Sequence, residues 1–285
     1  MLTQAQEVTF RNRGVIRLPG VLPTEISDRT REEIVRLAEK VGCLAEGCWQ
    51  REALAGDGHH KTATRYNKLV KRLRKVTGRN GFMTSSLHAA MDELVGGAAL
   101  TSWSEKSELL FSRPASRGDI TAPPVSSSAT LRPPRGPFPW HVDVPRLATT
   151  GVIGVQMFTF LHTVESGGGG TAIVTGSHRL LNGVTVRLKE IKRELEREPF
   201  FRALYARDRG DVAGLFETTG RAGGVDLEVV ELVGEPGDVY LMDLRVLHTR
   251  CSNTRPTPRM MITQRFVLES VRPQLKYRYF GLAAT

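Results

Sequence analysis

Two histidines and a carboxylate stand at positions that suit a metal site. His141 and Asp143 are two residues apart, His248 lies far downstream, and Arg259 follows it by eleven residues. Two histidines and one carboxylate, with open coordination positions, form the ligand set of non-haem Fe(II) oxygenases. The planar guanidinium of an arginine suits a carboxylate co-substrate, which it can bind through two parallel hydrogen bonds. If these four residues meet in space, the chain is predicted to carry oxygenase chemistry.

Taken singly, these residues have ordinary structural interpretations. A His-x-Asp tripeptide recurs by chance, and a lone histidine is more often a hydrogen-bonded structural residue than a ligand. Order and surroundings make the pattern more specific, because a long apolar stretch over 152–164 and a Gly-rich turn at 167–170 follow the tripeptide. On a strand, residues two apart face the same side, so His141 and Asp143 could reach one metal ion.

The C-terminal half of the chain is predicted to supply a β scaffold for these residues. Expected strands cover 109–111, 128–132, 152–164, 171–175, 228–232, 239–247 and 260–268. Short strands separated by turn residues indicate a sandwich or barrel. A helical pattern over 185–206 interrupts the series, so we interpret residues 182–226 as a helical insertion. Insertions of this kind often cover active sites.

The N-terminal third is predicted to be partly helical. Thr30 and Glu33 form a capping-box pattern, and the apolar helical period that follows can end at Gly42. A second helix is expected over 86–94. Residues 43–67 are rich in Gly, His and charge, which favours a loop.

Length and composition fit one globular unit of 285 residues, with 40% hydrophobic and 25% charged residues. There is no internal repeat and no linker, so we expect a single domain over 1–285, with its core at about 105–270. No apolar run is long enough for a transmembrane helix, and the first residues lack a secretory signal. The three cysteines fit reduced thiols, and a cytoplasmic protein is expected.

The net charge of +10 comes from 40 basic and 30 acidic residues. Such a charge could attract nucleic acid or other anions. The densest basic run, residues 68–79, has no interleaved aromatic residues and is better explained as a solvated helix face. A nucleic-acid binder would therefore rest on charge alone, and its affinity should fall steeply with salt.

Three segments carry a resemblance to a known family. FPWHVD, SGGGGTAIVTGSH and EPGDVYLMDLRVLH, together with the stretch from Asn253 to Arg259, resemble the phytanoyl-CoA dioxygenase family over roughly residues 105–270. The resemblance implies a mainly β fold with helices, built on a double-stranded β-helix (a jelly roll, cupin-like core) with N-terminal helices and a helical insertion. It also implies Fe(II), 2-oxoglutarate as co-substrate, and O₂.

The resemblance assigns roles to individual residues. It implies that His141, Asp143 and His248 bind iron and that Arg259 pairs with the distal carboxylate of 2-oxoglutarate. Ser128 and Phe158 fall near positions that line the co-substrate in the family.

Three further positions bear on the comparison with the family. Asn253 matches a recurring asparagine, or is simply a turn residue. Arg250 stands where some members have a small hydroxyl residue, which departs from the family pattern. Asp143, where a halogenase needs a vacant position, favours hydroxylation.

Family members act on acyl-CoA, ectoine and antibiotic intermediates, and this chain's C-terminal pattern is similar to that of an aminoglycoside-tailoring member. A small-molecule substrate, such as an aminoglycoside, is therefore expected. Because the chain is basic, a polycationic sugar would need nearby carboxylates, for which Glu46, Asp57, Glu165 and Asp243 are candidates. An anionic acyl-CoA would suit the net charge better. A cupin-like isomerase or ligand-binding protein with no oxidative activity remains an alternative.

Other reactive residues have simpler interpretations. Cys43 and Cys48 could form half of a zinc site, but no second cysteine pair completes it. His178 is interpreted as a structural or turn residue, and Cys251 as a packing residue near the metal.

Overall fold

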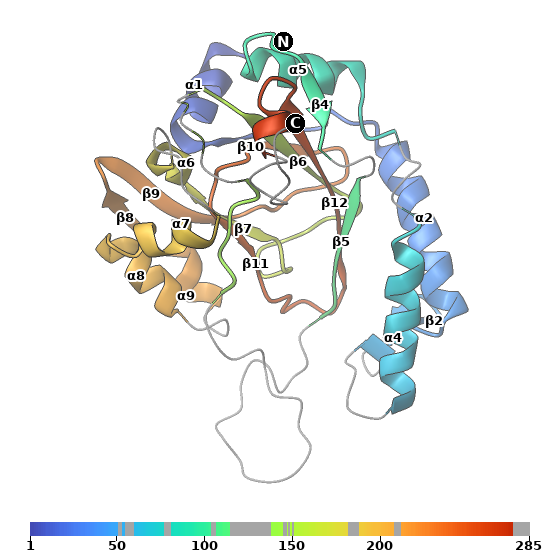
Figure 1. The fold of residues 1–285 in the computed structure, drawn as a ribbon. Coiled ribbons are helices and arrows are strands. Elements are labelled where there is room, and N and C mark those ends of the chain that lie inside the picture. Colours follow the sequence, from blue (N-terminus) through green and yellow to red (C-terminus); the bar gives the residue numbers. More distant parts are fainter. Residues whose placement is uncertain are drawn as a thin grey trace.

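Two antiparallel sheets face each other and carry helices on their outer sides (Figure 1). The computed structural model describes residues 1–50, 53–54, 60–76, 81–103, 107–114, 138–144, 147, 149, 151–181, 188–207 and 212–275. Its helices are α1 (Gln4–Arg13), α2 (Thr24–Lys40), α4 (His60–Leu73), α5 (Ser85–Leu94), α6 (Ser177–Leu180), α7 (Leu188–Leu195), α8 (Pro199–Ala206) and α9 (Val212–Phe216). The predicted class, mainly β with helices, is confirmed.

The strand order is that of a double-stranded β-helix. The larger sheet runs β1 (Val15–Leu18), β10 (Val239–Asp243), β6 (Gly154–Phe160), β12 (Arg259–Leu268) and β4 (Leu100–Ser102), and β5 (Glu108–Ser112) also pairs with β12. The smaller sheet runs β11 (His248–Arg250), β7 (Thr171–Thr175), β9 (Val225–Glu231) and β8 (Thr219–Ala222). From β6 to β7, and again from β9 through β12, the chain crosses between the sheets. This jelly roll confirms the predicted fold.

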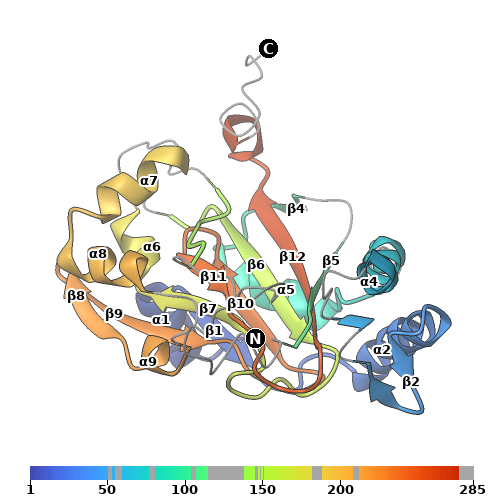
Figure 2. The ribbon, with the colours of Figure 1, turned by 90° about the horizontal axis from the view of Figure 1, so that it is seen from below.

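Both faces of the larger sheet are buried, and each has its own core. Along β12, Met261 packs with Phe158 and Phe160 between the two sheets. Its neighbours Met260 and Ile262 point the other way, into a core shared with α2, α4 and α5. Figure 2 shows this layering, with α2 and α4 beyond β5 on one flank and α7 to α9 on the other. Residues two apart on β12 therefore share a face, and one set of them lines the barrel interior.

The start of α2 differs from the expectation. The helix begins at Thr24, and the predicted capping box at Thr30 is wrong, because the Thr30 hydroxyl lies inside the helix and donates to the Ile26 carbonyl oxygen. Gly42 does follow the helix end, with a φ of 71° that favours glycine.

Residues 43–67 are not simply a loop. They contain a hairpin of β2 (Leu44–Ala45) and β3 (Cys48–Trp49), and α4 begins at His60. Helix α4 buries Leu69 and Leu73 while Lys68 and Lys71 stay exposed. The helical spacing of the apolar residues, rather than the polar composition, therefore decides the structure of this segment. This part of the basic run is a solvated helix face, as predicted.

The predicted insertion holds three helices in its described part. Pro199 opens α8 and separates it from α7, since proline is tolerated only in the first turn of a helix. The expectation of a helical insertion up to residue 226 is wrong at its end, because β8 and the start of β9 already belong to the smaller sheet.

The N-terminus contributes elements that the pattern analysis missed. A capping box between Thr3 and Gln6 opens α1, and β1 then pairs with β10. Gly14 joins them with a φ of 76°. A Cβ atom there would lie 2.5 Å from Nδ1 of His178 and 2.6 Å from Val246, so only glycine fits.

The expected strand 239–247 is broken by a turn just before His248. Asp243 ends β10, and its carboxylate accepts hydrogen bonds from the backbone and the guanidinium of Arg245. Both side chains are almost fully buried. Ser177 holds the other side of the turn, because its hydroxyl accepts from the Leu247 amide at 2.9 Å. These bonds set the direction in which the chain enters β11.

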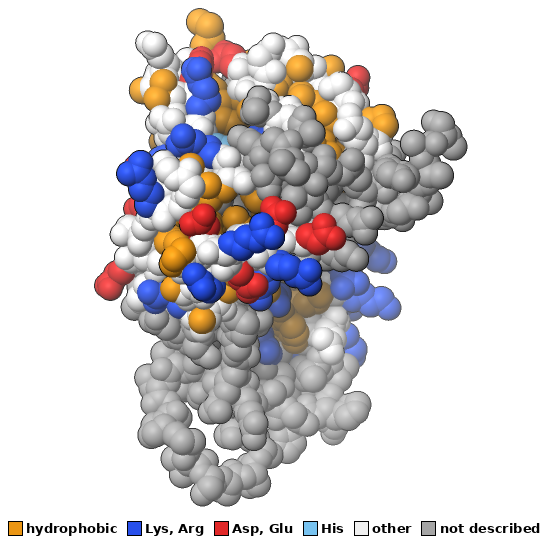
Figure 3. Space-filling model, turned by 60° about the vertical axis from the view of Figure 1, so that its left-hand side comes forward, with side chains coloured by type: hydrophobic (Ala, Val, Ile, Leu, Met, Phe, Trp, Pro, Cys, Tyr) orange, Lys and Arg blue, Asp and Glu red, His pale blue; other side chains and the backbone are white. Residues whose placement is uncertain are grey.

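The surface and the helices add two observations. No helix in the described part of the chain is long and apolar enough to cross a membrane. On the face drawn in Figure 3, Lys and Arg side chains lie among Asp and Glu side chains. The positive charge on that face is therefore interspersed with negative charge.

The buried Asp243–Arg245 pair gives a stability prediction. Asp243→Ala should lower the free energy of unfolding by about 3–5 kcal/mol, because it removes the carboxylate that faces a buried guanidinium. Urea unfolding of the whole chain measures this. Asp226→Ala is the matched control, since Asp226 also faces an arginine but its side chain is 93% exposed. Equal effects of the two substitutions would contradict the assignment.

Candidate metal centre

His141, Asp143 and His248 lie together at the mouth of the barrel. Their potential ligand atoms all fall within 4.8 Å of one another. Nε2 of His248 lies 3.5 Å from Oδ2 of Asp143, and the two imidazole centroids are 4.3 Å apart. The backbones of His141 and His248 exchange two hydrogen bonds, of 3.0 and 2.9 Å. His141 lies in this isolated bridge and not in a regular strand, so the expected strand geometry of His-x-Asp is not what brings the three together.

Each histidine is held by a backbone carbonyl. Nδ1 of His141 lies 2.9 Å from the oxygen of Pro139, and Nδ1 of His248 lies 3.0 Å from that of Val246. A carbonyl oxygen only accepts, so each Nδ1 must carry the proton. Nε2 of both rings is then the nitrogen with the free lone pair, which is the form that binds a metal.

The charge states also suit a cation. Burial lowers the pKa of His248 to about 4, so that its ring is neutral at pH 7. Burial alone would raise the pKa of Asp143, but attraction to His248 in its protonated form, and the charge and hydrogen bond of Arg265, hold that pKa below its ordinary value. The site therefore offers the neutral imidazole of His248 and an ionised carboxylate, with the imidazole of His141 beside them.

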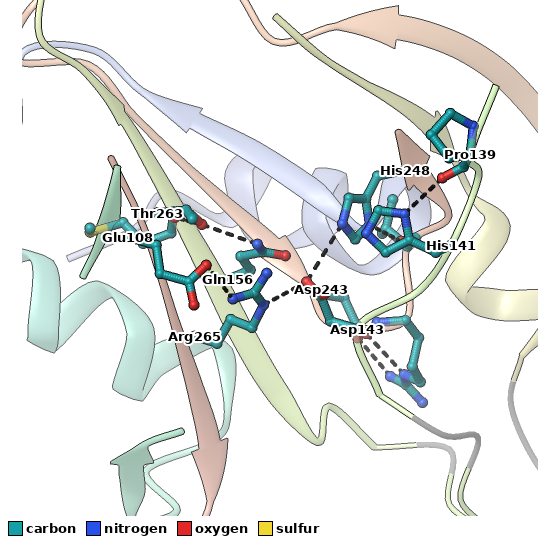
Figure 4. A network of polar contacts seen from close by, with 12 residues as sticks. Glu108, Pro139, His141, Asp143, Gln156, Asp243, His248, Thr263 and Arg265 are labelled. Atoms are coloured by element: carbon teal, nitrogen blue, oxygen red, sulfur yellow. Dashed lines mark hydrogen bonds and ion pairs between the residues drawn. The ribbon is translucent and has the colours of Figure 1, made fainter. Parts of the chain in front are cut away.

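Asp143 has a partner that the sequence reasoning missed. Nε of Arg265 donates to Oδ2 of Asp143 at 2.7 Å, and Nη1 donates to Glu108 at 3.3 Å (Figure 4). Arg265 lies six residues after Arg259 on β12, so the two face the same side of the sheet. This even spacing is the feature of the sequence that could have indicated Arg265 as a residue of the site. The interaction fixes the orientation of the carboxylate.

Arg259 is a buried cation with unused donors. Arg259 is the first residue of β12, and only 4% of it is exposed. Nε and Nη1 have no hydrogen-bond partner among the described residues. Burial lowers its pKa to about 10, which leaves it charged at neutral pH. Buried charges are normally paired, so these donors suit an anionic group.

The other predicted residues fall into separate places. Phe158 lies on the inner face of β6, in the core between the sheets. Ser128 is outside the described residues. Asn253 is a structural residue of its loop, because its amide donates to the Thr257 carbonyl oxygen at 2.7 Å and accepts from the Arg255 amide at 3.0 Å.

The two remaining predictions near β11 have different outcomes. Arg250 is exposed. It lies two residues after His248 and therefore on the same side of β11 as that histidine. Burial raises the pKa of Cys251 to about 12, which suits a packing residue and leaves the thiol unreactive.

The carboxylates proposed for a cationic substrate are not gathered at this centre. Asp243 is buried against Arg245, Glu165 pairs with Arg255, and Glu46 lies in the β2–β3 turn with a φ of 50°. Asp57 is outside the described residues. Glu108 is instead the half-exposed carboxylate that Arg265 links to Asp143.

Comparisons with known proteins give structural likenesses only. No family model and no curated protein matches the chain. Among solved structures it is similar to the non-heme alpha ketoglutarate dependent epimerase SnoN from nogalamycin biosynthesis, with 16% identity, a TM-score of 0.48, and coverage of 93% of this chain and 81% of SnoN. It is also similar to HygX from Streptomyces hygroscopicus with nickel and 2-oxoglutarate bound, with 15% identity, a TM-score of 0.48, and coverage of 94% and 88%. At this similarity, the roles of individual residues must be argued from this chain's own geometry.

The centre leads to a direct binding prediction. The chain should bind one Co(II), used as an air-stable substitute for Fe(II), and Asp143→Asn should weaken that binding by more than the about 10- to 100-fold typical of losing an outer partner of a ligand. Calorimetric titration measures it. Asp92→Asn, an exposed carboxylate on α5, should leave the affinity unchanged. Unaltered binding in Asp143→Asn would exclude this carboxylate as a ligand.

Proposed function

We propose that this protein is a non-haem Fe(II)- and 2-oxoglutarate-dependent dioxygenase acting on a small molecule. The observation that carries the proposal is the pairing of two features. Two histidines and an ionised aspartate converge at one point, and a buried guanidinium lacks a hydrogen-bonded anionic partner among the described residues. The first fits a cation such as Fe(II), and the second fits a dicarboxylate co-substrate.

His141, Asp143 and His248 would hold the iron through Nε2, a carboxylate oxygen and Nε2. Three ligands leave positions for a chelating 2-oxo acid and for O₂. The bound iron supplies oxygen activation, in which 2-oxoglutarate and O₂ become succinate and CO₂ while one oxygen atom enters a substrate C–H bond. The protein keeps His248 neutral, and Arg265 orients the ionised carboxylate of Asp143.

Arg259 would bind the far carboxylate of 2-oxoglutarate. A guanidinium can form two parallel hydrogen bonds to a carboxylate, and the low-polarity surroundings strengthen the attraction. Phe158, on the inner face of β6, would border the same co-substrate, as would Ser128. The family resemblance noted in the sequence gives these residues the same roles.

The substrate we propose is an amino sugar of antibiotic biosynthesis, such as kanamycin B. Hydroxylation at an amine-bearing ring carbon gives a carbon with both hydroxyl and amine, and loss of ammonia then leaves the 2'-keto sugar. Glu108 supports the proposal of a cationic substrate. It is a half-exposed carboxylate, and Arg265 pairs with both Glu108 and Asp143. The whole chain, residues 1–285, would act as a single catalytic domain.

Turnover tests the oxygenase proposal. With Fe(II), 2-oxoglutarate and O₂, kanamycin B should stimulate succinate formation, and His141→Ala should abolish that stimulation because one iron ligand is lost. Chromatographic measurement of succinate and of the sugar product gives the result. His88→Ala is the control, since His88 lies exposed on α5 and pairs only with Asp92 among the described residues. Full turnover by His141→Ala would refute the assignment, and metal binding without 2-oxoglutarate consumption would favour the non-oxidative alternative.

The co-substrate site is tested separately by binding. Arg259→Met should weaken 2-oxoglutarate binding to the Co(II)-loaded protein by about 10- to 100-fold, because hydrogen bonds to a charged group are lost. Anaerobic calorimetry measures the dissociation constant. Arg221→Met, a mostly exposed arginine on β8, should bind as the wild type does. If both variants bind 2-oxoglutarate equally well, Arg259 is not the anchor.

A further inference from the structure

Gln156 presents a buried hydrogen-bond acceptor inside the barrel. The residue lies on β6 and pairs in register with Met242 of β10 and Arg265 of β12. It shares the inner face with Phe158, two residues along, and only 1% of it is exposed. A polar amide at this position is unusual, since buried polar groups normally find hydrogen-bond partners.

A neighbouring threonine fixes the orientation of the amide. The Thr263 hydroxyl donates to the Met157 carbonyl oxygen at 2.8 Å, so its only proton is already used. It can therefore only accept from Gln156, whose Nε2 lies 3.0 Å away. The nitrogen of the amide must face Thr263, and the oxygen must face the other way.

The amide oxygen is left without a partner. Oε1 of Gln156 is buried and accepts no hydrogen bond from any described residue. Figure 4 shows that it points away from Thr263, towards the side of the barrel where Asp143 and His248 lie. An unsatisfied buried acceptor destabilises the folded chain, so a bound group that donates a hydrogen bond would explain it.

The charge of the co-substrate excludes it from this role. Ionised 2-oxoglutarate has only acceptor oxygens, so it cannot donate to Oε1. Arg265, the neighbour in register, already donates to Asp143 and Glu108. In the described part of the chain no group donates to Oε1, so we look to a second bound molecule for the donor.

We propose that Oε1 of Gln156 is a substrate-binding group, which accepts a hydrogen bond from a hydroxyl or ammonium group of a polar substrate placed beside the metal centre. This inference rests on the proposed function and deepens it by naming a residue that would bind the substrate. The substrate carries an O–H or N–H donor near the C–H bond that reacts. A purely hydrocarbon segment at this point would leave the acceptor unsatisfied.

The first test compares two glutamines in the metal-free chain. Gln156→Met removes the unsatisfied acceptor, so its Tm should equal or exceed that of the wild type. Gln264 lies on the opposite face of β12, and both ends of its amide are bonded, to Ser107 and Ser102. Gln264→Met should lower Tm by about 2–4 °C. A loss of Tm in Gln156→Met as large as that in Gln264→Met would overturn the claim that the acceptor is unsatisfied.

The second test places a donor-rich probe near the metal. The whole chain is loaded with Mn(II) and 2-oxoglutarate, and the relaxation of D-glucosamine protons by the paramagnetic ion is measured by NMR. The wild type should accelerate this relaxation, and Gln156→Met should lose most of the effect, with affinity about 3- to 10-fold weaker. Gln264→Met should behave as the wild type.

The possible failures are distinguishable. If the wild type binds neither Mn(II) nor 2-oxoglutarate, the proposed function fails. If it binds both but does not relax glucosamine, or if Gln156→Met relaxes it equally, the inference about Gln156 fails alone. A changed Mn(II) affinity with unchanged glucosamine relaxation would assign Oε1 to a water on the metal and would also overturn it.

Discussion

The backbone bridge between His141 and His248 is the contact on which the site depends. These residues are more than a hundred positions apart, and two short hydrogen bonds between their main chains bring the imidazoles together. The bridge extends the smaller sheet by one pair beyond β11, and it also places Asp143 opposite Arg265 of the larger sheet. The distance between the parts of the site therefore depends on how the two sheets pack, and on the irregular segment that carries His141 and Asp143.

The barrel interior combines an apolar core with a few polar groups that are not fully satisfied. Buried Arg259 and Gln156 each carry polar atoms with no partner in the described parts of the chain, whereas buried Asp243 and Arg245 bond to each other. Buried polar groups therefore have two different roles in this barrel. The Asp243–Arg245 pair stabilises a turn, while the unsatisfied groups lower stability and leave donors and an acceptor for bound molecules.

Much of the fold was predictable because its signals are local. Thr171–Thr175 and the helix ending at Leu94 follow from apolar periodicity and flanking glycines, and the metal triad with Arg259 follows from residue type, order and family resemblance. Arg265 and Gln156 could not be found in that way. Their importance depends on the register between β6 and β12, which a single sequence does not specify. The start of α2 was predicted wrongly because Thr30 resembles a capping residue in the sequence. In the structure it lies within the helix, and its hydroxyl donates to the Ile26 carbonyl oxygen.

Strand β12 sets the spacing between two arginines of the barrel interior. Arg259 and Arg265 stand six residues apart, or about 20 Å along an extended strand, and both face inward. Inserting or deleting a single residue between them would turn one arginine towards the helix-packed core, so that Arg259 and Arg265 could no longer both face the barrel interior. A point substitution in β12 keeps the register of the inward-facing residues, whereas a change of length within the strand shifts it.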